Sequence, residues 1–234
     1  MSYREHAPPP ELAPWLACTW ERRGSGGSPV RVLPDGCVDV VWTQGVDTQI
    51  VGANTTAFLV PLRADTQVVG ARLRPGAAPA LLGVPGEALR DARVPLREVW
   101  GGEGERLAST LEESPDRVVA MRDGLRARAA RAERPDPMVR RAVTALARPD
   151  VAVSELAAEL GLSERQLRRR FSSDVGYGPK RLARVLRLLR ALEWARTGDD
   201  LGRVALEAGY ADHAHFSNDC RALAGVTPSQ VLAS

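Results

Sequence analysis

Three side chains in the N-terminal half have the types and spacing of a polar or metal-binding site. Asp35, Cys37 and Asp39 occupy alternate positions, so in a β-strand they would share one face. One interpretation is a metal or polar ligand site, completed by Cys18. The other is a turn carboxylate, a half-buried thiol and a solvated carboxylate. We favour the second and predict no metal, because structural zinc sites usually take four Cys or His ligands and only these two cysteines and His6 are available here.

Tryptophans and an arginine in the same half suggest a pocket for a small effector. Arg72 could pair with an anionic group inside such a pocket. The alternative is that the tryptophans pack in the core, as large aromatic side chains usually do, and that Arg72 forms a surface ion pair. The residues expected to line the pocket are Trp20, Asp35, Cys37, Trp42 and Arg72.

Residues that could support catalysis are not arranged for it. The sequence contains no evident combination of nucleophile, base and acid, and no glycine loop of the kind that cradles phosphate. We therefore predict that the protein is not an enzyme and needs no cofactor.

Positive charge is concentrated in one segment of the C-terminal half. Residues 163–190 contain nine basic and two acidic residues, although the whole chain carries a net charge of only +3. A patch this dense suits a polyanion such as DNA. A solvated helix face is the alternative.

The first part of this segment has the pattern of two helices joined by a tight turn. Gly161 supplies a residue that accepts positive φ. Ser163 and Gln166 then form a capping box at the start of the second helix. The inward positions are Leu156, Ala157, Leu160, Leu167 and Phe171, which leaves Arg165, Arg168 and Arg169 facing outward. This spacing is typical of a helix-turn-helix.

The same pattern recurs 48 residues later. Ala205 and Gly209 repeat the small residue and the glycine, and Asp212 is the expected cap. Phe216 and Cys220 take the inward positions. The outward positions are His213, Ala214, Ser217, Asn218 and Arg221. A helix over 179–194, with proline in its first turn, would connect the two motifs.

These motifs need elements that position them, and the chain divides accordingly. Short apolar runs punctuated by Gly and Pro make residues 1–100 strand-rich, with strands expected at 51–53, 57–62 and 67–73 and a hairpin tip at 65–66. Residues 101–134 read as a helical connector and residues 135–234 as helices with short turns. The predicted fold is α+β, with a β-rich, barrel- or cupin-like domain before an all-α double helix-turn-helix domain.

Residues from about 137 to 234 resemble the AraC/XylS-type transcription regulators. The resemblance rests on Ala205, Gly209-Tyr210, Phe216-Ser217 and the run from Gly225 to Ser229. Residues from about 8 to 100 also resemble a small β-rich domain found in part of that family, through the runs 33–39 and 69–76. The chain departs from the family pattern at Asn218, where arginine is usual, and at Cys220, where phenylalanine is usual.

The resemblance implies a sequence-specific regulator of transcription. Its recognition helices, 163–172 and 212–222, would lie in adjacent major grooves, and the first should dominate affinity because residues 200–224 carry a net charge of −2. The implied base-contacting residues are Arg165, Arg168, Arg169, His213, Ala214, Ser217 and Asn218. The residues expected to contact phosphate are Lys180, Arg181, Arg184, Arg187 and Arg221.

Several partners follow as expectations. Double-stranded DNA is the main one, RNA polymerase is implied by the resemblance, and a small effector would act through the N-terminal half. Residues 103–131 carry an apolar stripe that either forms a homodimer or packs on its own β domain. No apolar run is long enough to span a membrane, so we expect a cytoplasmic activator. The alternative is an effector-independent DNA-binding protein whose N-terminal domain makes only protein contacts.

Overall fold

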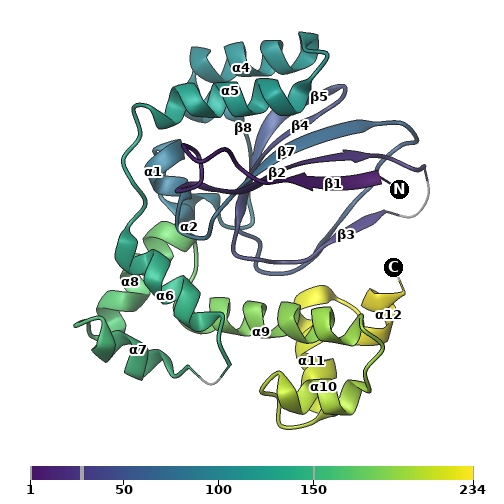
Figure 1. Cartoon of the computed structure of the whole chain (residues 1–234), viewed down its shortest axis with the longest axis vertical. Coiled ribbons are helices and arrows are strands. Elements are labelled where there is room, and N and C mark those ends of the chain that lie inside the picture. Colours follow the sequence, from purple (N-terminus) through teal and green to yellow (C-terminus); the bar gives the residue numbers. More distant parts are fainter. Residues whose placement is uncertain (1, 27–28, 150, 234) are drawn as a thin grey trace.

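The computed structural model describes residues 2–26, 29–149 and 151–233. A β-sheet with helices on one face forms the upper part of the molecule in Figure 1, and a row of helices forms the lower part. None of the helices in these ranges is long and apolar enough to cross a membrane.

The N-terminal domain is built on an open, antiparallel six-stranded sheet. In spatial order its strands are β1 (Ser2–His6), β2 (Leu16–Arg23), β7 (Gln67–Leu73), β4 (Val38–Thr43), β5 (Val46–Val51) and β8 (Arg93–Pro95). A second ladder pairs β3 (Val30–Val32) with β6 (Phe58–Val60). The predicted α+β class is confirmed, whereas the expected barrel is not formed because β1 and β8 remain edges of the sheet.

One face of the sheet is covered by helices. Alternate residues of β4 are buried, and Val38, Val40 and Trp42 point into the core. The covering helices are α1 (Ala78–Leu82), α2 (Gly86–Leu89), α3 (Leu96–Trp100), α4 (Gly102–Glu113) and α5 (Arg117–Ala129). Leu107, Leu111 and Leu125 are all buried, so the apolar stripe of 103–131 packs on its own domain.

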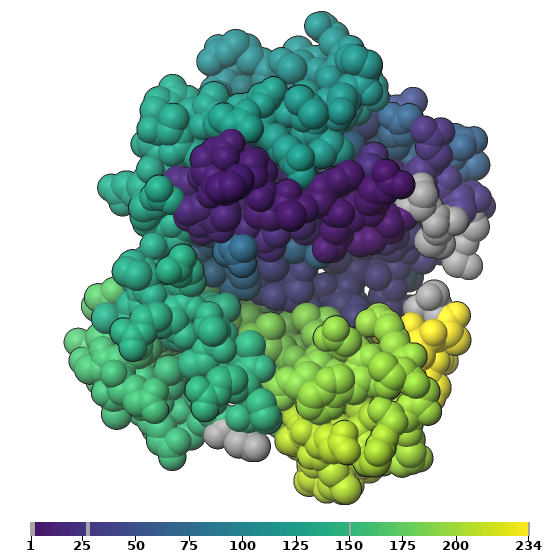
Figure 2. Space-filling model, viewed as in Figure 1, coloured from purple at the N-terminus to yellow at the C-terminus, as the bar shows by residue number. Residues whose placement is uncertain are grey.

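The C-terminal region contains seven helices within the described ranges. They are α6 (Pro137–Leu146), α7 (Val153–Glu159), α8 (Glu164–Val175), α9 (Pro179–Ala195), α10 (Leu201–Glu207), α11 (His213–Ala224) and α12 (Pro228–Leu232). Figure 2 shows them as two lobes beneath the β domain. The predicted connecting helix corresponds to α9.

Two apolar cores hold the molecule together. The larger runs from the sheet through α1 and α2 into α6, α7 and α8, and ends at Leu182 of α9. The smaller core begins at Val185 of α9 and includes α10, α11 and α12. The two lobes in Figure 2 therefore differ, because the lobe with α6–α8 shares its core with the β domain.

The strand predictions were partly right. β7 has the bounds that the sequence suggested. Asp65 does lie in a turn, with φ of 58°, but the strands that flank it do not pair with each other. Residues 94–101 contribute β8 and α3, and the prediction missed β1 and β2.

Candidate functional site

The first helix pair consists of α7 and α8 and has the predicted turn and cap. Gly161 takes φ of 66°. The Ser163 amide donates to Gln166 Oε1 at 2.8 Å, and the Gln166 amide donates to Ser163 Oγ at 3.3 Å. Leu167 and Phe171 are completely buried. The inward face and the reciprocal cap together fix which side of α8 reaches solvent.

Three arginines occupy the solvent side of α8. Arg165, Arg168 and Arg169 are exposed, and none forms a hydrogen bond or ion pair with another residue that the structure describes. Their neighbour Arg170 differs, because it donates to Asp136 Oδ2 at 2.8 Å. The trio therefore presents guanidinium groups that are available to an external acceptor.

The second helix pair consists of α10 and α11. Gly209 has φ of 86°, and Asp212 caps α11 by accepting from the His215 amide at 2.7 Å. His213, Ala214 and Asn218 are exposed as expected. Ser217 was predicted to face outward, but it is only 8% exposed. It follows Phe216 on the edge of the inward face, so the helix buries it.

Arg221 is exposed, and its Nη1 donates to Asn218 Oδ1 at 3.3 Å. The two side chains form the outer C-terminal part of α11. Asn218 is therefore partly engaged inside the helix, unlike the three arginines of α8.

The arginines of α9 are mostly engaged within the protein. Asp219 of α11 is only 4% exposed. It accepts a hydrogen bond from Arg184 Nε and another from the Tyr210 hydroxyl at 3.0 Å, and Arg187 Nη2 lies 3.7 Å from its Oδ2. Burial and the nearby Asp219 carboxylate raise the pKa of Tyr210. This network joins α9 to α11.

Arg181 and Lys180, also predicted to contact phosphate, differ from each other. Arg181 Nη2 donates to the Thr55 carbonyl of the β domain at 2.7 Å. Lys180 is exposed. The sequence analysis missed Asp219, although its position three residues after Phe216 places an acid near the buried side of the helix.

The β domain contacts the C-terminal ends of both helices that carry the predicted reading residues. Near the end of α8, the Asp174 carbonyl is so close to Gly86 that a Cβ there would be 2.8 Å away. At the end of α11, the Ala57 amide donates to the Leu223 carbonyl at 2.7 Å, and Arg31 Nη1 donates to the Ala224 carbonyl at 2.8 Å. The N-terminal parts of α8 and α11 thus point away from the β domain (Figure 1).

A cavity of about 570 Å³ lies on the other face of the sheet, between the six-stranded sheet and the β3–β6 ladder. Four of the five predicted pocket residues line it: Trp20, Asp35, Cys37 and Arg72. The prediction for Trp42 was wrong. Its ring is 1% exposed on the opposite face, where Nε1 donates to Glu112 Oε2 at 3.0 Å.

A charged cluster forms one end of this cavity. Arg72 Nε lies 3.3 Å from Asp35 Oδ2 and 3.4 Å from Asp39 Oδ1, and its Nη1 lies 3.4 Å from Glu5 Oε1. Burial raises the pKa of Asp39 to about 7, although Arg72 opposes the shift. The arginine that was expected to await an anionic ligand is thus surrounded by carboxylates.

Cys37 belongs to the same cluster. Its amide donates to Asp35 Oδ1 at 2.9 Å, and burial raises the pKa of its thiol well above the ordinary value. Among the described residues, no group of three or more His, Cys, Asp or Glu side chains could hold a metal ion.

The loop from Leu33 to Asp39 also touches the C-terminal helices. Gly36 has φ of 80°, and a Cβ there would lie 2.6 Å from Leu182 Cδ1 of α9. Leu33 packs against the smaller core, and Leu189 of α9 lines the cavity itself. One loop therefore links the cavity to the helical region.

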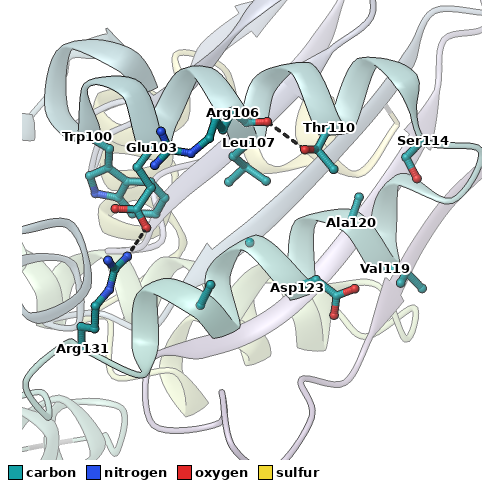
Figure 3. A pocket seen from close by; sticks show the side chains of 12 residues that line it. Trp100, Glu103, Arg106, Leu107, Thr110, Ser114, Val119, Ala120, Asp123 and Arg131 are labelled. Carbon is teal, nitrogen blue, oxygen red and sulfur yellow. Dashed lines mark hydrogen bonds and ion pairs between the residues drawn. The ribbon is translucent and has the colours of Figure 1, made fainter.

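A second hollow, of about 480 Å³, lies between α4 and α5 (Figure 3). Glu103 at one end holds Arg131 Nη2 at 2.6 Å and Arg128 Nη1 at 3.3 Å. None of the predicted site residues lines this hollow. Its most distinctive carboxylate is already paired, so the charged cavity is the stronger candidate for a ligand site.

Comparison with known families agrees with the two regions described above. Residues 156–234 match the family described as "Helix-turn-helix domain", and residues 4–95 match "Domain of unknown function (DUF6597)". No curated protein sequence matches the chain. The protein is an AraC-type helix-turn-helix DNA-binding transcription regulator with a β-rich N-terminal domain.

Solved structures resemble either the C-terminal region or the whole chain. An AraC-type transcriptional regulator from Chromobacterium violaceum is 29% identical, with 42% of this chain and 90% of that chain covered and a TM-score of 0.39. The C-terminal domain of AraT, a response regulator from Geobacillus stearothermophilus, is 24% identical, with 42% and 85% covered and a TM-score of 0.39.

ToxT from Vibrio cholerae O395, bound to (E)-4-(8-methylnaphthalen-1-yl)but-3-enoic acid, covers 100% of this chain. The alignment includes 99% of ToxT at 10% identity and a TM-score of 0.50. At that identity the likeness concerns the two-domain fold alone.

Proposed function

We propose that this regulator reads DNA by placing α8 and α11 in adjacent major grooves, and that a small molecule in the sheet cavity modulates the binding. The N-terminal parts of both helices point away from the β domain (Figure 1). The 17 residues of α9 give a connecting rod of about 26 Å at 1.5 Å per residue. That length suits two reading helices spaced by about one turn of DNA, roughly 34 Å.

The observation that carries the proposal is the unpaired arginine trio on α8. Arg165, Arg168 and Arg169 are exposed and free of partners in the described chain. A guanidinium can donate to both O6 and N7 of guanine, which is worth about 1–3 kcal/mol of discrimination against a wrong base. We propose these three as the main base-reading residues.

The second reading helix contributes less. His213, Ala214 and Asn218 are exposed near the start and middle of α11, but Ser217 is buried and is not proposed as a base contact. Residues 200–224 also carry a net charge of −2, which weakens their attraction to DNA phosphates. We propose that this helix adds modest specificity.

Backbone contacts fall to the exposed cations. Lys180 and Arg221 are proposed to contact phosphates, which would make affinity fall with salt. Arg184 and Arg187 are proposed to position α11 through Asp219. Contact with RNA polymerase, activation of transcription and a homodimer are further proposals that rest on the family resemblance alone.

The cavity is proposed as the effector site because its walls include parts of the domain interface. The 33–39 loop contributes both cavity residues and the Gly36 contact with α9. The β3–β6 region covers the cavity, and Arg31 and Ala57 within it hold the end of α11. A ligand that moves this cover would shift α11 relative to α8.

The test begins by selecting bound DNA from a random pool with the full chain. Affinity for the selected site is then measured by fluorescence anisotropy. We expect Arg168→Ala to weaken binding about tenfold and to relax the preference at one base position, since one lost pair is worth about 1–3 kcal/mol. Asn218→Ala should cost no more than about threefold, well below such a pair.

Arg106→Ala, on the outer surface of α4, is the matched control and should bind like the unchanged protein. A larger loss at Asn218 than at Arg168 would contradict the assignment. So would a uniform loss at Arg168 with unchanged base preference.

A further inference from the structure

We propose that the sheet cavity takes an amphiphilic organic cation, with its ammonium group beside Asp39 and its hydrocarbon part along the aliphatic strands. This inference rests on the proposed effector role of the cavity and names the chemical class of the effector. It replaces the anionic group that Arg72 alone suggested.

The cavity walls favour a hydrocarbon part. Aliphatic side chains from several strands and from α9 form most of the lining: Val30, Val32, Leu33, Val41, Val46, Val51, Val60, Leu62, Val68 and Leu189. The volume of about 570 Å³ lies within the 300–1,000 Å³ typical of small-molecule sites. A ligand of drug-like size would bury most of its apolar surface there.

The floor of the cavity presents an aromatic face next to the charged end. Trp20 lies across Gly70 of β7, and a Cβ at Gly70 would be 2.3 Å from the indole ring. The glycine therefore allows the ring to lie flat on the sheet. Gly70 is two residues from Arg72, so Trp20 adjoins the charged cluster. Indole faces attract ammonium groups within about 6 Å.

Charge at the end of the cavity favours a cation. Asp35, Asp39 and Glu5 surround the single guanidinium of Arg72, so carboxylates outnumber cations. Asp39 Oδ1 is buried and makes no hydrogen bond with the described residues. An uncompensated buried carboxylate is costly. An ammonium group would supply the missing charge and donors, whereas a carboxylate ligand would add to the excess.

Three other arginines line the cavity, but they are held elsewhere. Arg22 lies over the Tyr3 ring at 4.9 Å, and Arg93 over the Phe58 ring at 4.3 Å. Arg31 donates to the Ala224 carbonyl. Arg22 pairs with Val68, four residues along β7 from Arg72, which is about 13 Å at 3.3 Å per residue.

Arg93 is exposed on the edge strand β8, where water screens its charge. The opposite strand order places it two strands from Asp39, at Val51, or about 10 Å at 4.8 Å per strand. The buried carboxylates therefore dominate the field at the closed end.

Three probes of equal chain length test the class of ligand: decylammonium, decanoate and decanol, each below its micelle concentration. Binding to the full chain is measured by thermal shift and calorimetric titration. Decylammonium should raise Tm and bind at least tenfold more tightly than the other two. Asp39→Asn should remove at least tenfold of that affinity, and the exposed control Glu98→Gln should leave it unchanged.

Tighter binding of decanoate, especially binding lost in Arg22→Ala or Arg93→Ala, would overturn the proposed class. Equal binding of all three probes, binding of none, or decylammonium binding unaffected by Asp39→Asn would overturn it as well. If Asp39→Asn does not fold, the ranking of the probes on the unchanged protein decides.

DNA anisotropy with each probe separates the two proposals. Decanoate that binds and changes DNA affinity would preserve the effector role and reject the cation. Decylammonium that binds at Asp39 without changing DNA affinity would preserve the cation and reject the effector role.

Discussion

Arginines of identical chemistry take different roles here because of the acids near them. The trio on α8 has no carboxylate partner within the described chain, so its donors remain available. Arg184 and Arg187 meet Asp219, which is buried and would be costly to leave unpaired. The first group suits readout of an external acceptor, and the second suits the fixing of one helix against another.

The raised pKa of Asp39 predicts a stability that falls as pH rises. Its folded-state pKa is about 7, against an ordinary value of 3.8, so the folded chain holds this proton more tightly than the unfolded chain. The stabilisation is complete below pH 4 and is lost as pH rises to about 7. The groups that face Asp39 are Arg72 from β7, Asp35 from the preceding loop and Trp20 from β2.

Asp39→Asn should remove this pH dependence. Between pH 4 and 7, the free energy of unfolding of the variant should rise relative to the unchanged protein by about 2 kcal/mol, since each unit of pKa shift is worth 1.36 kcal/mol. Urea unfolding across that range measures it. Glu87→Gln, an exposed carboxylate of α2, is the control. A constant difference between variant and parent would contradict the assigned pKa.

Two residues show where side-chain direction could be read from the sequence and where it could not. Trp42 is an odd number of positions from Asp39, so alternation along β4 already places the two on opposite faces. Ser217 lies at the edge of the inward face of α11, and its burial depends on neighbouring helices. Strand parity was available and was not applied, whereas the burial of Ser217 needed tertiary structure.

At the scale of elements, the helices of the C-terminal region were predictable because their signals are local. Both turn glycines, Gly161 and Gly209, have positive φ, and the caps at Ser163 and Asp212 are present. Each signal depends on residues within one turn of chain. The helix-turn-helix geometry therefore follows from short-range stereochemistry.

The sheet was less predictable because its neighbours are distant in sequence. β7 lies between β2 and β4, and no local signal states that order. The turn at Asp65 suggested a hairpin, yet β6 pairs with β3 instead. The cavity depends on that pairing, so the sequence could suggest Asp35, Cys37 and Arg72 as neighbours but not the cover above them.

The capping box of α8 gives a prediction at this scale. Ser163→Ala should lower the free energy of unfolding by about 1 kcal/mol, because the Gln166 amide loses its acceptor at the start of the helix. DNA affinity should fall with it, since the cap orders the turn that carries Arg165. Urea unfolding and anisotropy are the measurements.

Ser163→Asp should restore both quantities, because aspartate is an equally good cap. Ser154→Ala, at an exposed position of α7, should change neither. A loss in Ser154→Ala equal to that in Ser163→Ala would show that the cap is not the cause.

At the scale of the whole molecule, the β domain acts as a support for both reading helices. It contacts α8 through α2 and α11 through Arg31 and Ala57, each near its C-terminal end. The support is unequal, because α8 shares a core with the sheet and α11 does not. The second reading helix is therefore the one that can shift when the cavity cover moves.

This inequality predicts how the full chain opens under native conditions. Hydrogen exchange reports the local free energy of opening, and α6 and α8 should exchange together with β7 because one core contains all three. The elements α10, α11 and α12 should form a separate unit that exchanges at least about tenfold faster, a difference of 1.4 kcal/mol. The division should fall within α9, between Leu182 and Val185. Exchange that divides instead near residue 134, with α6 to α12 opening as one body, would mean that the helical region moves as a rigid whole. In that case a ligand in the cavity could not change the spacing of the two reading helices.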